Sequence, residues 1–199
     1  MEQQLSNEKI PDLSFAHLAP EVWESLGKIK RTGWVKRGVE NPETVQEHTI
    51  ALRELAWSFG LEEEVKKGLI EMLEAHDWPE AIEGDQVIVT SDQEEKRRLK
   101  LEKFKKEKKA LEEICAPMGS IGEKIMALWL RFEESDDKIA TFARELDKYQ
   151  AIEKSLQYEK EQRILCFKEF FDYNGPNITD RILLKKLSEL KEEWDSFQS

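Results

Sequence analysis

Apolar residues recur at helical spacing along most of this sequence, and one such stripe ends on a histidine that is followed by Asp77. The stripe comprises Val65, Leu69, Met72, Leu73 and His76. Long stretches rich in Glu, Lys and Leu, interrupted by only nine glycines and six prolines, also favour helices. We therefore predict an all-α fold, with residues 86–90 as the only strand candidate.

The length of 199 residues suits one domain with a sizeable core. We predict a flexible N-terminus over residues 1–12 and a single domain over residues 13–199, with C-terminal helices packed on it. The expected helices cover residues 13–30, 41–60, 65–76, 91–114, 122–132, 135 onward, 162–173 and 179–194. Capping residues are predicted at Asn41, Ser91 and Ser135.

The formal net charge of -11 argues against a nucleic-acid or anionic-membrane partner, because both require a basic surface. Cys115 and Cys166 form no Cys-x-x-Cys motif, so neither a disulfide framework nor a thiolate metal site is indicated. The start of the chain lacks the pattern of a signal peptide, and no run approaches the ~20 apolar residues that span a bilayer. We expect a cytoplasmic protein.

Two histidines occupy apolar stripes on consecutive helices. His48 lies near the beginning of the first stripe and His76 near the end of the next, and the connection between the helices is short. The helices should be antiparallel neighbours, which places both histidines at the same end of the pair. Each histidine alone could be a hydrogen-bonded core residue, but together, with Asp77 adjacent, they favour a metal site.

Two further features each allow two interpretations. Asp147 lies on the core-facing stripe of the helix from residue 135, where a carboxylate needs either a lysine partner or a metal ion. Residues 28–37 carry five positive charges and no negative one. This basic segment is either a solvated loop or an anion site in which arginine binds phosphate.

The order of these motifs resembles the HD-domain superfamily, and more closely its small 5'-nucleotidases. The resemblance covers residues 18–158, about 70% of the chain. Its motifs are Arg31-Thr-Gly-Trp34, residues 35–48 ending in Glu-His48, residues 76–85 beginning His76-Asp77, Glu94-Glu-Lys96 and Leu146-Asp147-Lys148. It implies a single-domain helical bundle that hydrolyses (deoxy)nucleoside 5'-monophosphates to nucleoside and phosphate, and a homodimer.

The resemblance also implies a role for individual residues. One divalent ion, Co, Mn, Mg, Fe or Zn, would be bound by His48, His76, Asp77 and Asp147, whose mixed imidazole and carboxylate donors suit such metals. Glu80 would transfer a proton, and Asp85 would orient the attacking water or a sugar hydroxyl. The expected substrate-binding residues are Arg31, Trp34 and Arg37.

Two other functions compete with this hypothesis. One is a catalytically idle HD-domain protein that binds a nucleotide or a partner and keeps the metal for stability. The presence of Glu80 and Asp85 argues against it, because a purely structural metal site needs neither. The other is a helical scaffold without metal, in which His48, His76 and Asp147 satisfy one another.

Overall fold

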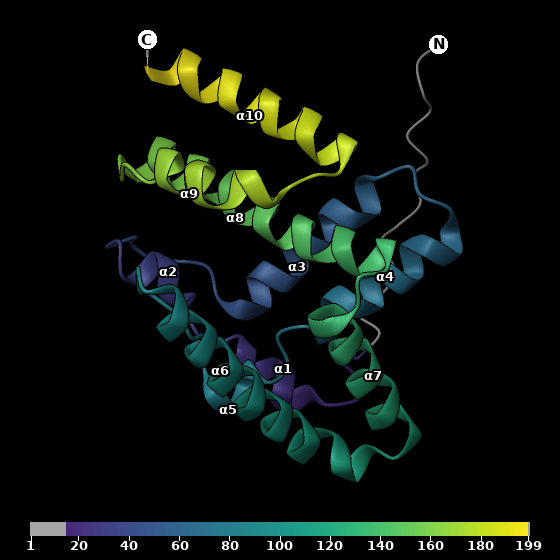
Figure 1. Cartoon of the computed structure of the whole chain (residues 1–199). Coiled ribbons are helices and arrows are strands. Elements are labelled where there is room, and N and C mark those ends of the chain that lie inside the picture. Colours follow the sequence, from purple (N-terminus) through teal and green to yellow (C-terminus); the bar gives the residue numbers. More distant parts are fainter. Residues whose placement is uncertain (1–14, 199) are drawn as a thin grey trace.

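The computed structural model describes residues 15–198, and in this range the protein is built from helices (Figure 1). The helices are α1 (Pro20–Leu26), α2 (Thr32–Val35), α3 (Val45–Ser58), α4 (Glu63–Ala75), α5 (Glu80–Glu83), α6 (Gln93–Cys115), α7 (Ser120–Glu134), α8 (Lys138–Gln162), α9 (Phe167–Asn174) and α10 (Arg181–Gln198). Within these residues the strand-like pairing is limited to one antiparallel β-bridge between Lys30 and Thr44. The all-α prediction is confirmed, while residues 1–12 lie outside the described range.

The centre of the molecule is formed by α3, α4 and α8. The ring centroids of His48, at the start of α3, and His76, just after α4, are 5.6 Å apart, so the two helices run antiparallel as predicted. Buried residues from all three helices, such as Leu52, Leu73 and Leu146, belong to one apolar core. On the other side of α8 pack α9 and α10 (Figure 1).

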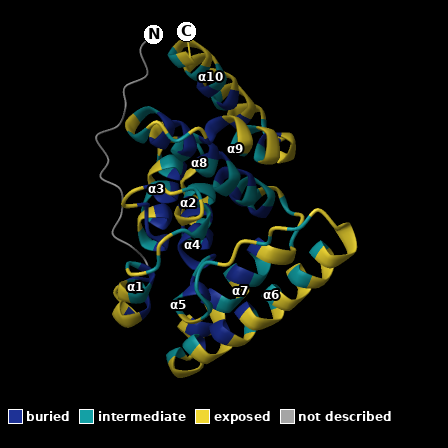
Figure 2. Ribbon diagram, turned by 90° about the vertical axis from the view of Figure 1, so that its left-hand side faces the viewer, coloured by how far each residue is buried: buried dark blue, intermediate teal, exposed yellow. Residues whose placement is uncertain are grey.

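A second apolar core joins α6 and α7 to α1. Trp78, Leu111 and Trp129 are buried in it, and the ring of Phe104 stacks on Trp129 at a centroid distance of 5.2 Å. The outer face of α6 is exposed along its length (Figure 2). The N-terminal part of α6 approaches α9, because the ammonium of Lys96 lies 3.2 Å from the hydroxyl of Tyr173.

Some local predictions were wrong. The residue that caps α3 is Thr44, because Asn41 adopts a left-handed backbone conformation with φ 49°. Asp92 caps α6 and Asp137 caps α8, in place of Ser91 and Ser135, since each aspartate accepts two backbone N–H bonds.

The boundaries of other predicted elements also differ from the structure. The helix expected over residues 13–30 is α1, which begins only at Pro20, and Leu18 before it is exposed. Residues 86–90 form a loop with exposed valines instead of a strand. The predicted helix 162–173 begins at Phe167, because α8 continues to Gln162 and ends where Arg163 turns left-handed. None of the helices within residues 15–198 combines the length and apolar character that crossing a lipid bilayer requires.

Thr44→Ala should lower the free energy of unfolding by about 1 kcal/mol. The Thr44 side chain accepts the N–H of Glu47 at 3.1 Å, and the Glu47 carboxylate accepts the N–H of Thr44 at 2.7 Å. Urea unfolding would measure the change. Ser58→Ala, at the exposed opposite end of α3, is the control and should change stability by less than about 0.5 kcal/mol. Equal stabilities of the two variants would contradict the assigned cap.

Candidate metal centre and active site

Three segments bring a pair of imidazoles and a pair of carboxylates together. His48 lies in the first turn of α3, His76 and Asp77 follow α4, and Asp147 lies in α8. Ligand atoms of His48, His76 and Asp147 all lie within 4.8 Å of one another. Asp77 Oδ2 is 3.2 Å from His76 Nε2 and 3.7 Å from His48 Nε2. The structure thus brings together all four residues predicted to bind metal.

The ring of His48 is held by a buried chain of hydrogen bonds. Its Nδ1 atom lies 2.9 Å from Gln150 Oε1, and Gln150 Nε2 donates to Glu43 Oε2 at 3.2 Å. The other oxygen of Glu43 accepts the indole N–H of Trp34 at 3.0 Å. Because the amide nitrogen of Gln150 faces Glu43, its oxygen faces His48 and requires a proton on Nδ1. The Nε2 atom is then left with a free lone pair.

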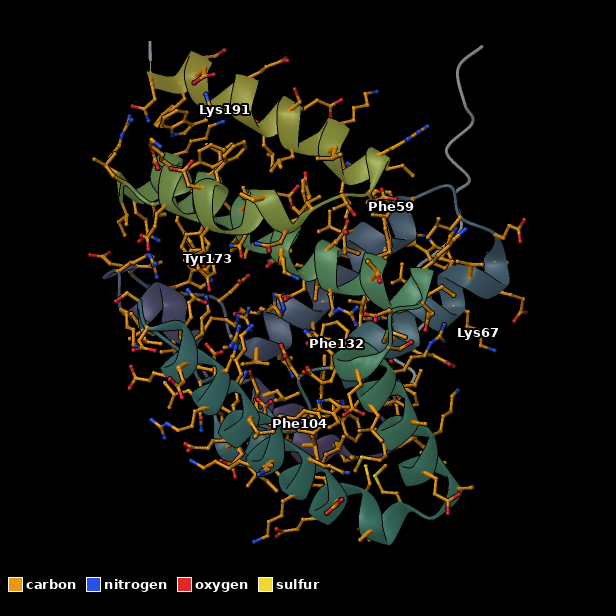
Figure 3. The ribbon with its side chains drawn as sticks, in the orientation of Figure 1. Phe59, Lys67, Phe104, Phe132, Tyr173 and Lys191 are labelled. Carbon is orange, nitrogen blue, oxygen red and sulfur yellow. The ribbon has the colours of Figure 1, made fainter. Side chains whose placement is uncertain are left out.

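The ring of His76 is also fixed by a hydrogen bond at its Nδ1 atom. Its Nδ1 atom lies 2.7 Å from the carbonyl oxygen of Leu73, so Nδ1 carries the proton and Nε2 points into the site. Its ring also packs beside Phe132, at a centroid distance of 4.9 Å; Figure 3 labels Phe132 near the centre of the molecule. Among the described residues, no hydrogen-bond partner satisfies the buried Nε2 atoms of His48 and His76. Two buried, unsatisfied imidazole nitrogens beside carboxylates fit a divalent metal ion.

The carboxylates of this cluster are held ionised. Burial alone would raise the pKa of Asp77, but the charges of His76 and Arg31 lower it well below its usual range. Burial would likewise raise the pKa of Asp147, but the contact with His48 lowers it to about 2. The Asp77 charge in turn outweighs the burial of His76 and raises its pKa to about 9, so a metal ion that binds Nε2 takes the place of a proton there. Two partly buried negative charges therefore face the space between the imidazoles, which favours a cation.

Arg31 belongs to this centre. Its Nη1 atom lies 3.5 Å from Asp77 Oδ2 and 3.8 Å from Asp85 Oδ1, and its Nη2 atom lies 4.0 Å from Asp147 Oδ1. The backbone fixes this position, because the N–H of Arg31 donates to the carbonyl of Glu43 at 3.0 Å. Arg31, which belongs to the basic segment 28–37, therefore does not extend into solvent but lies against the candidate metal ligands.

Glu80 differs from the aspartates around it. It begins the short helix α5, its residue surface is 3% exposed, and its Oε2 atom has no hydrogen-bond partner among the described residues. Burial, and then the negative charge of Asp77, raise the pKa of Glu80 well above its usual range. The structure therefore favours a protonated Glu80 beside ionised Asp77, and neighbouring carboxyl groups in different protonation states suit proton transfer.

Asp85 closes the loop that follows α5. Gly84, at φ 74°, turns the chain there, and Asp85 Oδ2 accepts the backbone N–H of Thr32. The hydroxyl of Thr32 donates to the carbonyl oxygen of Asp85 at 2.6 Å. These contacts fix Asp85 beside Arg31, at the edge of the centre.

Trp34 and Arg37 lie farther out. Trp34 is 2% exposed and stacks on Phe170 of α9 at a centroid distance of 4.4 Å. Arg37 Nε donates to Glu169 Oε2 at 3.0 Å, and its Nη1 atom donates to the carbonyl of Gly33 at 2.7 Å. Both residues line a cavity that opens at the centre, but the Arg37 guanidinium is already engaged by a carboxylate.

Two cavities meet at Arg31, Asp85 and Asp147. The smaller, about 230 Å³, lies between α2, α8 and α9 and includes Trp34 and Phe170 in its wall. The larger, about 470 Å³, reaches His76, Asp77 and Glu80 and extends along α6. Its wall includes Lys96, Lys100, Lys103, Lys148 and Tyr173. In Figure 3 Tyr173 lies on the side of α9 that faces α2 and α6.

Some residues of the site were missed in the sequence. In the sequence, Gln150 lies on the same core-facing stripe as Asp147, in the helix expected from residue 135. A polar residue on such a stripe indicates a buried polar role. Lys103 on α6, in the helix expected over residues 91–114, was not predicted to belong to the site. Its Nζ atom lies 3.1 Å from Glu107 Oε1 and 3.9 Å from Glu80 Oε1. That contact joins segments distant in sequence, so no local pattern indicates it.

Known proteins share both this sequence pattern and this fold. The HD domain family matches residues 23–183. The 5'-deoxynucleotidase HDDC2 of Dictyostelium discoideum is 32% identical over 161 residues, which cover 74% of this chain and 81% of that protein. The human 5'-deoxynucleotidase HDDC2 is 26% identical over 170 residues, covering 84% and 80%.

Solved structures with low sequence identity have the same fold. A predicted metal-dependent phosphohydrolase from Magnetospirillum magnetotacticum superimposes with a TM-score of 0.63 at 20% identity, covering 93% of this chain and 95% of that one. A protein from Pyrococcus horikoshii gives 0.66 at 20% identity, covering 87% and 97%. This chain belongs to the HD-domain superfamily. Within it, the resemblance to the 5'-deoxynucleotidases is confirmed.

Gln150→Leu should weaken binding of a divalent metal by about 10- to 100-fold, because the His48 ring loses the acceptor that fixes its tautomer. Titration calorimetry with Mn²⁺ would measure the affinity. Gln150→Glu keeps an acceptor for His48 but places a carboxylate against Glu43, so circular dichroism should first verify that both variants are folded. Unchanged Mn²⁺ affinity in a folded Gln150→Leu protein would contradict this role.

Proposed function

We propose that this protein is a metal-dependent phosphoric monoester hydrolase that cleaves 2'-deoxynucleoside 5'-monophosphates to nucleoside and phosphate. The observation that carries the proposal is the pair of oriented, unsatisfied imidazole nitrogens facing two ionised aspartates, with buried Glu80 and Arg31 beside them. The relatives named 5'-deoxynucleotidase support the choice of substrate.

In this proposal His48, His76, Asp77 and Asp147 hold one divalent ion, of which Co, Mn, Mg, Fe and Zn are the candidates. When bound, such an ion acidifies water and neutralises negative charge on a phosphoryl group. The protein contributes the tautomers of the two histidines, through Gln150 and the Leu73 carbonyl, so that both Nε2 atoms are available.

Arg31 and Glu80 act on the substrate itself. The guanidinium of Arg31 presents several N–H donors at the mouth of the centre and can bind phosphate oxygens in place of its long contacts to Asp77, Asp85 and Asp147. Protonated Glu80 donates its proton to the leaving 5'-oxygen, which becomes the hydroxyl of the product nucleoside. Asp85, fixed by Thr32, orients water or a sugar hydroxyl.

The nucleoside would occupy the smaller cavity. Its wall carries Trp34 and Phe170, whose rings suit the flat face of a base or the apolar face of deoxyribose. Trp34 is held rigidly by Glu43 and Phe170, so it can exclude an additional 2'-hydroxyl group. Arg37, the second arginine that the resemblance assigns to substrate binding, borders this cavity and is bound to Glu169.

The proposal also includes a homodimer located in the cytoplasm and a nucleotide as the small-molecule substrate. The dimer follows from the family resemblance alone. The formal net charge of -11 supports a protein that does not bind nucleic acid.

Glu80→Gln should lower kcat by about 100- to 10,000-fold while the protein still binds metal. Because the raised pKa keeps Glu80 protonated, the wild-type rate should fall as pH rises through that pKa, and this limb should be absent in the variant. Asp77→Ala, in comparison, should lose both metal and activity. Full activity of Glu80→Gln would refute the proton-transfer role.

Phosphate release should be measured for a panel of deoxynucleoside and ribonucleoside 5'-monophosphates, with each candidate metal or a chelator. We expect release that requires metal and favours the deoxynucleotides. Trp34→Phe replaces the indole with a smaller apolar ring and should reduce the preference for deoxynucleotides. Absence of release from every monophosphate by metal-loaded protein would favour the idle nucleotide-binding alternative.

A further inference from the structure

Lys148 occupies the junction of the two cavities. It follows Asp147 on α8, and it lines both the smaller and the larger cavity, as Arg31, Asp85 and Asp147 also do. In the function proposed above, the phosphate group must reach the metal ligands at this junction. Lys148 is therefore placed beside the phosphate, although neither the sequence motifs nor the comparisons give it a role.

The other partly buried cations of the two cavity walls are engaged. Arg37 binds Glu169, and Lys103 binds Glu107. The Lys96 ammonium lies 3.2 Å from the hydroxyl of Tyr173. Arg31 has three carboxylates around it, all at 3.5 Å or more. Lys148 is thus the remaining partly buried cation of the two cavity walls whose role these contacts do not explain.

The ammonium of Lys148 has spare hydrogen-bonding capacity. Its Nζ atom donates to the carbonyl oxygen of Arg144 at 3.0 Å. Within residues 15–198 Lys148 forms no ion pair with a carboxylate, although the charges of Asp147 and Glu145 act on it at longer range. An ammonium has three N–H donors, so further donors remain for a ligand. Partial burial of a cation without a contacting counter-ion is unfavourable, and an anion at the junction would relieve this cost.

We propose that Lys148 binds an oxygen of the substrate phosphate at the metal centre, opposite Arg31. Arg31 approaches from the segment before α2 and Lys148 from α8, so the two cations reach the junction from different elements. Lys148 therefore supplies the second positive side chain for the phosphate, while Arg37 remains bound to Glu169 in the wall of the nucleoside cavity. The proposal rests on the hydrolase function given above.

The test is binding of inorganic phosphate, the product, to the full-length protein saturated with Mn²⁺. Titration calorimetry should compare the wild type with Lys148→Met, which keeps most of the length of the side chain without its charge, and Lys148→Arg, which keeps the charge. Lys100→Met is the matched control. Lys100 is exposed, lines only the larger cavity, and its replacement removes the same charge.

Lys148→Met should raise the Kd for phosphate by about 10-fold or more, and Lys148→Arg should restore part of the affinity. Lys100→Met should change it by less than about twofold, because an exposed charge at a distance is screened. The Kd for the product deoxynucleoside and for Mn²⁺ should be unchanged in all three variants.

Three results would overturn the proposal. They are an unchanged phosphate Kd in Lys148→Met, an equal loss in Lys100→Met, which would indicate only a general electrostatic effect, and a loss of Mn²⁺ or nucleoside binding in place of phosphate binding. Because phosphate is the product of any phosphomonoesterase, the result does not depend on the substrate. Phosphate binding through Lys148 without cleavage of nucleotides would reject the proposed substrate and leave this inference intact.

Discussion

The hydrogen bond between Gln150 on α8 and His48 on α3 is the constraint on which the centre depends. Gln150 can accept from His48 only because its amide nitrogen is directed at Glu43, and Glu43 is held in turn by the indole of Trp34. The chain of contacts ties α2, the segment before α3, and α8 to one imidazole ring. A buried polar network of this kind is stable only when each member is satisfied, so it specifies how these elements meet.

The same fold imposes two protonation states on neighbouring carboxyl groups. Asp77 lies against His76 and Arg31, and these charges hold it ionised despite burial. Glu80, at the start of α5, is buried with an oxygen that has no hydrogen-bond partner among the described residues, and the charge of Asp77 opposes its ionisation. Carboxyl groups close in sequence can therefore serve as a candidate metal ligand and as a candidate proton donor, because their surroundings differ.

Periodicity predicts much of this structure, since apolar stripes depend on residues close in sequence. It predicted that α3 and α4 are antiparallel and bring His48 and His76 together. It also identified Asp147 as a carboxylate on a core-facing stripe. Caps were less predictable, because nearby residues such as Ser91 and Asp92 compete for the same backbone groups and only their geometry decides. Contacts between distant segments, such as Lys103 with Glu80 and Arg37 with Glu169, leave no local signal in the sequence.

The central claim is that two imidazoles, each fixed by a hydrogen bond at Nδ1, bind one divalent metal ion through Nε2. X-ray absorption spectroscopy on protein loaded with Co²⁺, combined with elemental analysis, tests it most directly. We predict one ion per chain with two imidazole ligands and oxygen donors in the remaining positions. A different stoichiometry, or a metal environment without imidazole, would contradict it.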